Sequence, residues 1–175
     1  MTLLSEPDTA QRAPRGYLGS TTPLDERDEQ RTPRPVFEFA RRRWDPEIDL
    51  AATPENALLP RYLTREEDAL SIDWSGLADC GWCNPPYSSV APWINAAFAS
   101  RTGFRTVLLL PTPNGERVYH RILQESSEIV YITGRLAFLL PDGRARSGNT
   151  RGSCYVVIDS RPGPPIVSVV RREEL

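Results

Sequence analysis

The sequence predicts an α/β fold whose sheet is mostly parallel and includes an antiparallel strand pair towards the C-terminus. Strand-like and helix-like patterns alternate between residues 80 and 132, which is typical of a parallel sheet covered by helices. Beyond them, the apolar segments 135–140 and 153–158 flank the turn-rich stretch 141–149, and this arrangement favours an antiparallel pair. The chain has 175 residues, enough for one compact domain with a substantial core.

The two ends of the chain differ in composition from its centre. Residues 1–30 are rich in Pro, Thr, Arg and acidic residues without apolar periodicity, so we expect a mobile tail. We expect the domain itself to span residues 31–160. Residues 161–175 then form a C-terminal tail, in which 166–170 is expected to be a last, peripheral strand.

The first part of the expected domain contains a short helix and a short strand. The helix runs through Val36, Phe37 and Phe39, and residues 48–52 form the strand. Residues 56–68 have no regular pattern and are expected to be irregular. An acid and small residues stand at the end of the 48–52 strand, where parallel sheets place side chains that bind ligands.

The second part alternates strands and helices around one polar segment. An apolar strand ends at Cys83, so the polar residues that follow it lie at the carboxyl end of a strand. The later elements are, in order, a helix that Ser88 or Ser89 can cap, a buried strand at 106–110, an amphipathic helix at 118–123 and a strand at 128–132.

The polar segment reads Asn84-Pro85-Pro86-Tyr87, and its chemistry fits methyl transfer to a planar exocyclic amine. Such an amine is a poor nucleophile because its lone pair is delocalised into the ring. The side-chain carbonyl of Asn84 and the backbone carbonyl of Pro85 can accept its two N–H groups, and consecutive prolines hold the backbone rigid. Tyr87 can stack on an extruded base, a contact of about 1–3 kcal/mol. We predict these four residues to be catalytic, although a plain strand-to-loop turn is the alternative for so short a motif.

The net charge of the chain does not indicate nucleic-acid binding, whereas local clusters of arginine do. The net charge of −2 neither indicates nor excludes nucleic-acid binding, because phosphate contacts depend on local clusters. All 21 basic residues are arginines, for which the composition of the source genome is the simplest explanation. We predict nucleic-acid contacts from Arg135, Arg144, Arg146 and Arg151, around a glycine-rich loop. The triplet 41–43 is equally compatible with a solvated helix end.

Several function classes are disfavoured. No stretch approaches the roughly 18 apolar residues of a membrane span, and the N-terminus lacks a signal pattern, so we expect a cytoplasmic protein without a membrane partner. The three cysteines are expected to be free thiols. Cys80 and Cys83 have the spacing of a redox dithiol or half a zinc site. However, the residues 84–86 cannot start the required helix, and only Cys154 and His120 remain as further ligands, so we expect no metal.

A series of motifs resembles the phage-type DNA N6-adenine methyltransferases, a branch of the S-adenosylmethionine-dependent amino-methyltransferases. The resemblance runs from about residue 32 to residue 158. It rests on residues 32–33, 49–52 with Asn56, 60–62 with 68–70, 82–87 with 92–93, Pro111, 134–135, Phe138, 148–149 and 152–153.

The resemblance implies a Rossmann-like class I methyltransferase sheet that binds S-adenosylmethionine over the first strand and the target adenine at the 84–87 loop. It implies cofactor contacts from Thr32, Pro33, Asp49, Ala51 and Asp68. The Gly-x-Gly turn that usually follows the first strand in the wider superfamily is replaced here by residues 51–54.

The implied activity is adenine N6-methylation of double-stranded DNA in a bacterial or phage-infected cell, by direct transfer to a flipped base without a covalent intermediate. Sequence specificity is expected to be low or limited to a few bases, because the chain leaves no room for an inserted recognition domain. The alternatives are methylation of an RNA base or a protein glutamine, a catalytically inactive nucleic-acid-binding module, and a structural or interaction protein.

Overall fold

A computed structural model describes residues 28, 30–113, 115, 117–145, 151–161 and 163–175 of the chain. One sheet contains the strands β1 (Ile48–Asp49), β2 (Cys80–Cys83), β3 (Arg105–Pro111), β4 (Glu128–Thr133), β5 (Ser153–Ile158) and β6 (Ile166–Arg171). The helices with described bounds are α2 (Arg34–Trp44), α3 (Val90–Ser100) and α4 (Arg117–Glu125), with the short 3-10 helices η2 (Ala69–Ser71) and η3 (Arg172–Glu174).

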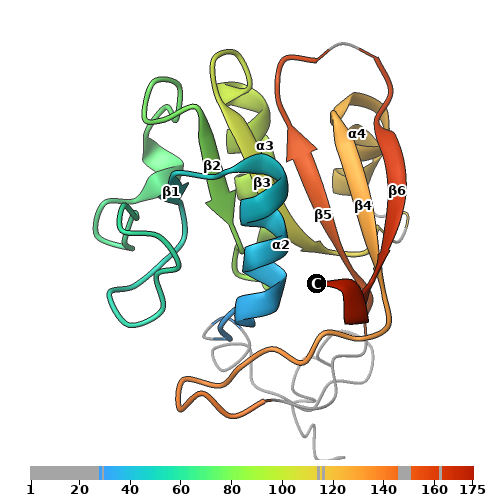
Figure 1. Cartoon of the computed structure of the whole chain (residues 1–175). Helices are drawn as coiled ribbons and strands as arrows, with labels where there is room; N and C mark the ends of the chain where they lie inside the picture. Colours follow the sequence, from blue (N-terminus) through green and yellow to red (C-terminus); the bar gives the residue numbers. More distant parts are fainter. Residues whose placement is uncertain (1–27, 29, 114, 116, 146–150, 162) are drawn as a thin grey trace, which may run out of the picture.

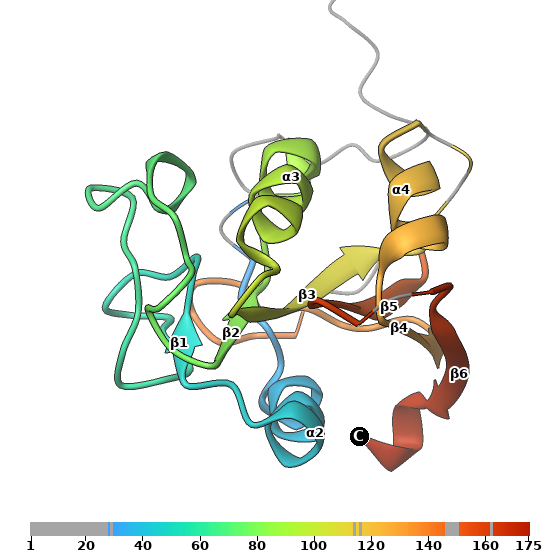
Figure 2. The same cartoon turned by 90° about the horizontal axis from the view of Figure 1, so that it is seen from above.

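The six strands lie in the order β1-β2-β3-β5-β4-β6 (Figure 1). β5 runs antiparallel to both of its neighbours, β3 and β4. The other neighbouring pairs, β1–β2, β2–β3 and β4–β6, are parallel. Figure 2 shows α3 and α4 on one face of the sheet and α2 with the C-terminal segment on the other. This mixed sheet with helices on both faces confirms the α/β class.

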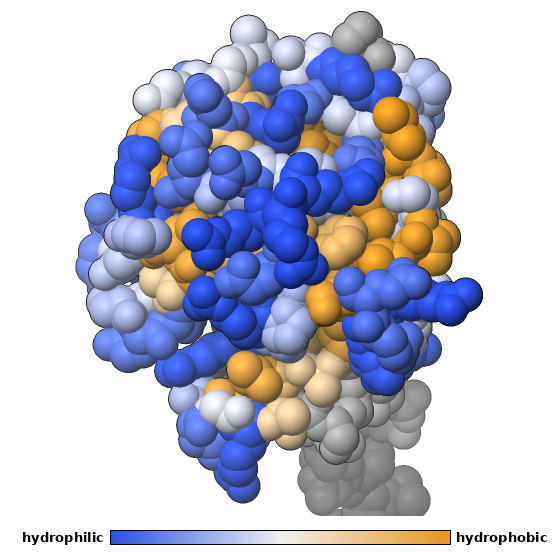
Figure 3. Space-filling view, in the orientation of Figure 1, coloured by the Kyte–Doolittle hydropathy of each residue, from blue (hydrophilic) through white to orange (hydrophobic). Residues whose placement is uncertain are grey.

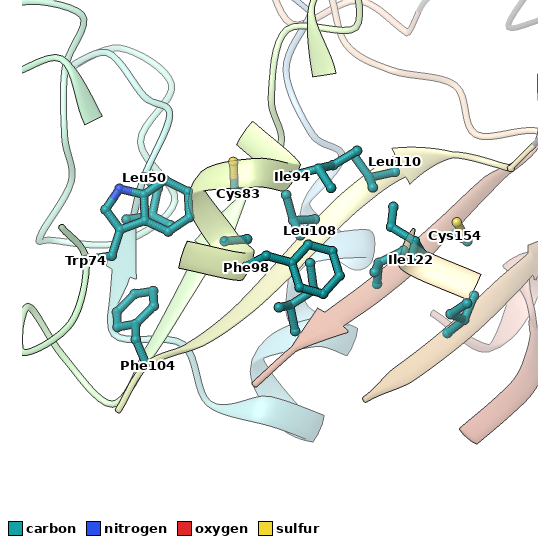
Figure 4. Packing of buried hydrophobic residues seen from close by; sticks show 14 of the residues in the cluster. Leu50, Trp74, Cys83, Ile94, Phe98, Phe104, Leu108, Leu110, Ile122 and Cys154 are labelled. Carbon is teal, nitrogen blue, oxygen red and sulfur yellow. The ribbon is translucent and has the colours of Figure 1, made fainter. Parts of the chain in front are cut away.

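Apolar side chains fill the space on each side of the sheet. Under α3 and α4, large residues such as Trp74, Phe98 and Leu108 form one cluster (Figure 4). Under α2, Phe37, Trp82 and Tyr155 belong to a second cluster. Because successive residues of a strand point to opposite faces, the apolar residues 107–110 of β3 supply both clusters, and β3 lies in the interior of the sheet.

Gly81 allows β2 to lie close against the layer above it. A Cβ at this position would be 2.6 Å from the ring of Phe104 and 3.1 Å from Leu50. The absence of a side chain therefore lets two core residues pack directly on the strand that precedes the 84–87 loop.

The expectation of a strand at residues 135–140 is wrong. The segment begins after Gly134, which has a φ of 84° and ends β4, and its residues up to Phe138 are not in a strand. Leu136 and Phe138 are buried while Arg135 is exposed, and this alternation is what the sequence pattern detected. A strand could not pair with β5 here, because β3 and β4 already occupy both edges of β5.

Other sequence expectations hold with changed bounds. The strand expected at 48–52 is shorter, since β1 ends at Asp49. The strand expected at 166–170 is β6, which pairs with β4 at the edge of the same sheet. The tail expected at 1–30 lies almost entirely outside the described residues. Within the described part of the chain, no helix is long and apolar enough to cross a membrane.

Candidate active site

A cavity of about 630 Å³ lies at the carboxyl ends of β1 and β2. Its wall includes residues that directly follow β1, such as Leu50 and Ala51, and residues that directly follow β2, such as Asn84 and Pro86. The two strands are parallel neighbours, so the segments after them meet at the same edge of the sheet.

The cavity brings together most of the residues that were predicted from two separate parts of the sequence. Thr32, Asp49, Ala51 and Asp68, predicted to bind a cofactor, line the same space as Asn84 and Pro86, predicted to be catalytic. Pro33, the remaining predicted cofactor residue, is the N-cap of α2 and directly follows Thr32. Pro85 is buried within the loop itself.

The side-chain carbonyl oxygen of Asn84 is an acceptor without a donor. This Oδ1 atom is buried and has no hydrogen-bond partner among the described residues. Buried polar atoms are nearly always paired, and an unpaired one costs about 1–3 kcal/mol. Because Asn84 also lines the cavity, a ligand N–H group placed there would satisfy this oxygen.

The loop after Asn84 is held in place at its far end. The amide of Ser89 donates a hydrogen bond of 3.1 Å to the carbonyl of Pro86, which closes a turn before α3. The carboxylate of Asp28 accepts hydrogen bonds from the amide of Ser88, at 3.2 Å, and from its hydroxyl. Asp28 lines the cavity as well, so this contact links the loop to the segment that precedes Thr32.

Tyr87 points its hydroxyl into the protein. Its ring packs edge-on against Phe138, with ring centroids 5.7 Å apart. The hydroxyl is buried and makes no well-formed hydrogen bond among the described residues. Burial raises the pKa of Tyr87 well above its usual range, although the nearby hydroxyl of Ser153 opposes the change. Tyr87 as a whole is half-buried, and it packs against the apolar cluster under α2.

Asp49 is a buried acid in the cavity wall. Its side chain is 3% exposed, and burial raises its pKa to about 6, although hydrogen bonds from the amides of Leu58 and Ala51 oppose the change. These bonds measure 3.2 and 3.3 Å. Asp49 therefore shapes the segment after β1 and also places a titratable carboxyl beside the cavity.

Asp68 differs from Asp49 in being exposed at the edge of the cavity. It precedes η2 and has a φ of 46°, a left-handed conformation that is uncommon outside glycine. Its carboxylate is therefore the more accessible of the two predicted cofactor acids.

Sequence reasoning missed several cavity residues. Arg31 and Arg65 bring positive charge to the wall, and Trp93 brings an aromatic surface. Trp93 stood in one of the quoted motifs, but nothing in its spacing assigned it a role. The two arginines had no pattern of their own, because they reach the cavity only through tertiary folding.

The predicted nucleic-acid contacts are found in different environments. Arg135 is exposed, and its backbone carbonyl accepts a hydrogen bond from Arg172. Arg144 is exposed but pairs with Asp142 at 2.7 Å. Arg151 is half-buried, and Arg146 lies outside the described residues.

The alternative basic cluster lies away from the cavity. Residues 41–43 form the last turn of α2, and Arg43 pairs with Glu128 at the amino end of β4. Arg41 is within 3.8 Å of Glu38. This cluster has the features of a solvated helix end, as one of the two sequence interpretations expected.

The cysteines are buried free thiols, as expected. Burial raises the pKa of Cys80 and Cys154 to about 12, and that of Cys83 well above its usual range. A thiol needs to ionise to attack as a nucleophile, so none of the three is suited to covalent catalysis. Among the described residues, no group of three or more His, Cys, Asp or Glu side chains is arranged to hold a metal ion.

Comparison with known proteins agrees with these features. A model of the family described as DNA N-6-adenine-methyltransferase (Dam) matches residues 19–175. A DNA N-6-adenine-methyltransferase of Haemophilus phage HP1 (strain HP1c1) is 30% identical over 125 residues, which cover 69% of this chain and 71% of that protein. The chain therefore belongs to the DNA N-6-adenine-methyltransferase family.

Proposed function

We propose that this protein transfers the methyl group of S-adenosylmethionine to N6 of an adenine flipped out of double-stranded DNA. The unpaired Oδ1 of Asn84 in the cavity wall is the observation that carries this proposal, because an adenine amine offers the N–H donor that the oxygen lacks. Family membership supports the same reaction.

The residues of the cavity fit the cofactor in charge and position. Thr32, Asp49, Ala51 and Asp68 would hold it, with Pro33 shaping the segment beside Thr32. When bound, S-adenosylmethionine supplies a methyl group activated by a positively charged sulfur. Asp49 is ionised above a pH of about 6 and contributes negative charge beside this cation, and the exposed Asp68 can accept hydrogen bonds from hydroxyl groups.

Asn84 and its neighbours would position the target amine. The Oδ1 of Asn84 and the backbone carbonyl of Pro85 accept its two N–H groups, which favours a tetrahedral nitrogen with its lone pair directed at the methyl group. Pro86 restricts the backbone beside these acceptors, and its carbonyl closes the following turn. Asn84 is neutral, so the surplus proton leaves after methylation and no strong general base is required.

Tyr87 would supply the hydrophobic surface on which the flipped base stacks. The inward direction of its hydroxyl supports a role for the ring and not for the phenol group. The three buried thiols are un-ionised, which favours direct transfer over a covalent cysteine intermediate.

The sheet fits the Rossmann-like class I methyltransferase architecture. Three adjacent parallel strands, β1 to β3, and helices on both faces support this assignment, since such sheets bind ligands at the carboxyl ends of their strands. The arginine-bearing segment 135–151 would contact the duplex. Its described part is tied to the cavity through Arg31, whose backbone pairs with Leu139.

The test is a methylation assay with labelled S-adenosylmethionine and three acceptors: unmethylated duplex DNA, RNA of the same sequence, and a glutamine-containing peptide. We expect label only in the DNA sample, as N6-methyl-2′-deoxyadenosine after hydrolysis to nucleosides. Label in RNA or peptide at an equal rate would replace the proposed substrate, whereas label in none would overturn the activity.

A matched pair of variants connects the activity to the cavity. Asn84→Ala should remove the label, and Asn95→Ala, which changes an exposed asparagine on α3, should leave it unchanged. Calorimetric binding of S-adenosylmethionine to both variants shows whether the protein remains folded and able to bind its cofactor.

A further inference from the structure

The outer edge of β6 is an unpaired strand edge with an apolar surface. β4 lies on one side of β6, and among the described residues no strand lies on the other. Ile166, Val167 and Val169 are 58%, 58% and 64% exposed, which is unusual for branched aliphatic side chains. Figure 1 shows β6 at the margin of the sheet, and Figure 3 shows hydrophobic surface along the same margin.

Natural sheets usually protect such an edge with charged residues, proline or a bulge. Among the described residues of this edge, such protection is found at the two ends of the strand: Pro164 and Pro165 precede it, and Arg171 is its last residue. The five residues 166–170 between them carry no charge and no proline. As far as the described residues show, the centre of the edge is therefore open to pairing with another strand.

The hydrogen bonds to β4 determine which groups of β6 face outwards. The amide of Ile166 donates to the carbonyl of Ser127, which precedes β4, so the backbone groups of Ile166 point inwards. The backbone N–H and C=O groups of successive residues point to alternate sides of a strand, so the groups of Val167 and Val169 point outwards. The outward amide of Arg171 is already bonded to the carboxylate of Glu174 at 3.0 Å, and Pro165 has no amide hydrogen. Val167 and Val169 thus provide the outward donors of the central edge.

We propose that two copies of this chain associate by antiparallel pairing of their β6 strands, with Ser168 on the two-fold axis. In this register Val167 of each copy pairs with Val169 of the other, and the two pairs form four backbone hydrogen bonds. The same pairs bring the exposed valine side chains together on one face. Both neighbouring registers are poorer, because one sets Val169 against Pro165 and the other sets Val167 against Arg171.

Charge and size agree with a second copy as the occupant. Arg171 lies at the end of the strand, so antiparallel pairing keeps the two copies of this residue far apart, and each is within 4.0 Å of its own Glu174. A six-residue edge is smaller than the roughly 800 Å² per partner of a typical stable interface, so we expect a reversible dimer with a dissociation constant in the micromolar range.

Cysteine cross-linking tests the proposed register directly. Residues that face each other in a non-hydrogen-bonded pair have Cα atoms about 4.5 Å apart, which allows a disulfide. Ser168→Cys should therefore form a covalent dimer under mild oxidation, whereas Val167→Cys and Val169→Cys should not. The three natural cysteines are buried and give little background. Cross-linking at residue 167 or 169 instead of 168 would overturn the register.

Sedimentation equilibrium across the micromolar range tests the association itself. Val169→Lys puts a charge on the outward valine and should raise the dimer dissociation constant by at least about tenfold. Ile72→Lys, which changes an exposed apolar residue beyond η2, near the opposite edge of the sheet, should leave it unchanged. A wild-type protein that stays monomeric throughout the range, or a Val169→Lys variant that dimerises normally, would overturn the proposal.

Discussion

The backbone of Arg31 pairs with that of Leu139 through two hydrogen bonds of 2.8 and 3.0 Å. Leu139 also pairs with Ala145, so residues 139–145 form a small closed loop, which is fastened to the residue before Thr32. Arg31 lines the cavity. The contact therefore ties the loop that carries Arg144, one of the proposed DNA-binding residues, to a residue of the cavity wall. Arg135 lies farther along the same segment, next to Arg172.

Asn84→Ala should lower the rate of methyl transfer by about 10²-fold or more, the usual cost of deleting one preorganised polar contact to the reacting group. The affinity for S-adenosylmethionine should change little, because the cofactor acids remain. Single-turnover rates and calorimetry measure the two quantities. Activity above a tenth of the wild-type value would mean that the 84–87 segment is a structural turn.

Tyr87→Phe should retain most activity and leave stability equal or slightly higher, because it deletes a buried hydroxyl that makes no well-formed hydrogen bond among the described residues. Tyr87→Ala should weaken binding of the flipped base by about 1–3 kcal/mol. The comparison uses affinity for duplexes with a mismatched adenine, in which flipping costs less. If the Phe variant were as impaired as the Ala variant, the hydroxyl would be the working group.

Because of the Asp49 carboxyl, the affinity for S-adenosylmethionine and the stability of the folded protein should change in opposite directions with pH. Its pKa is about 6 in the folded protein against 3.8 normally, so the folded state binds the proton more tightly. This residue's contribution to stability therefore falls as pH rises from about 4 to about 6, by about 3 kcal/mol in total, and stays constant above that. Affinity for the cationic cofactor should instead fall as pH drops, by about tenfold at pH 5.

Asp49→Asn isolates these effects, because it keeps the size of the buried side chain and removes its charge. The difference in unfolding free energy between the wild type and this variant should depend on pH only between about 4 and about 6. Cofactor affinity of the variant should lack the loss at low pH. A wild-type affinity that is constant between about pH 5 and about pH 7 would exclude a direct role for the Asp49 charge.

The sequence predicted the elements that depend on local pattern. The run 153–158 is β5 without change, because a fully buried strand appears in the sequence as a nearly continuous apolar run. Asn84 and Asp49 could be expected at one edge of the sheet, since both stand at the carboxyl ends of strands that turned out to be parallel neighbours. Here periodicity and the geometry of parallel sheets were sufficient.

The sequence did not predict features that depend on tertiary contacts, such as which strand edge is available for pairing. Residues 135–140 have a strand-like alternation, but both edges of β5 are occupied, so they cover the core as an irregular segment. The inward hydroxyl of Tyr87 and the pairing of Arg144 with Asp142 are likewise tertiary outcomes. The spacing of residues in the sequence predicts neither the direction of a side chain nor whether an arginine already has an ionic partner.

The salt dependence of DNA binding should distinguish the arginines of the 135–145 segment by their ionic partners. Each phosphate contact adds about 0.9 to the slope of log affinity against log salt, so Arg135→Gln should flatten the slope by nearly one. Arg144→Gln should flatten it less, because Asp142 already neutralises part of that charge. Asp142→Asn should then steepen the slope, since it releases Arg144 to contact phosphate. Arg101→Gln, near the amino ends of the strands, is the matched control and should change nothing.

Affinity measured from low to moderate salt, on one duplex and at one temperature, decides this point. Flattened slopes for Arg135→Gln with unaltered S-adenosylmethionine binding would support a duplex lying across the 135–145 segment. If all four variants had the same slope as the wild type and still methylated DNA, the segment would be a solvated, arginine-rich turn without phosphate contacts. The cations that line the cavity, Arg31 and Arg65, would then be tested next, because they lie closer to the proposed target base than residues 41–43 at the far end of α2.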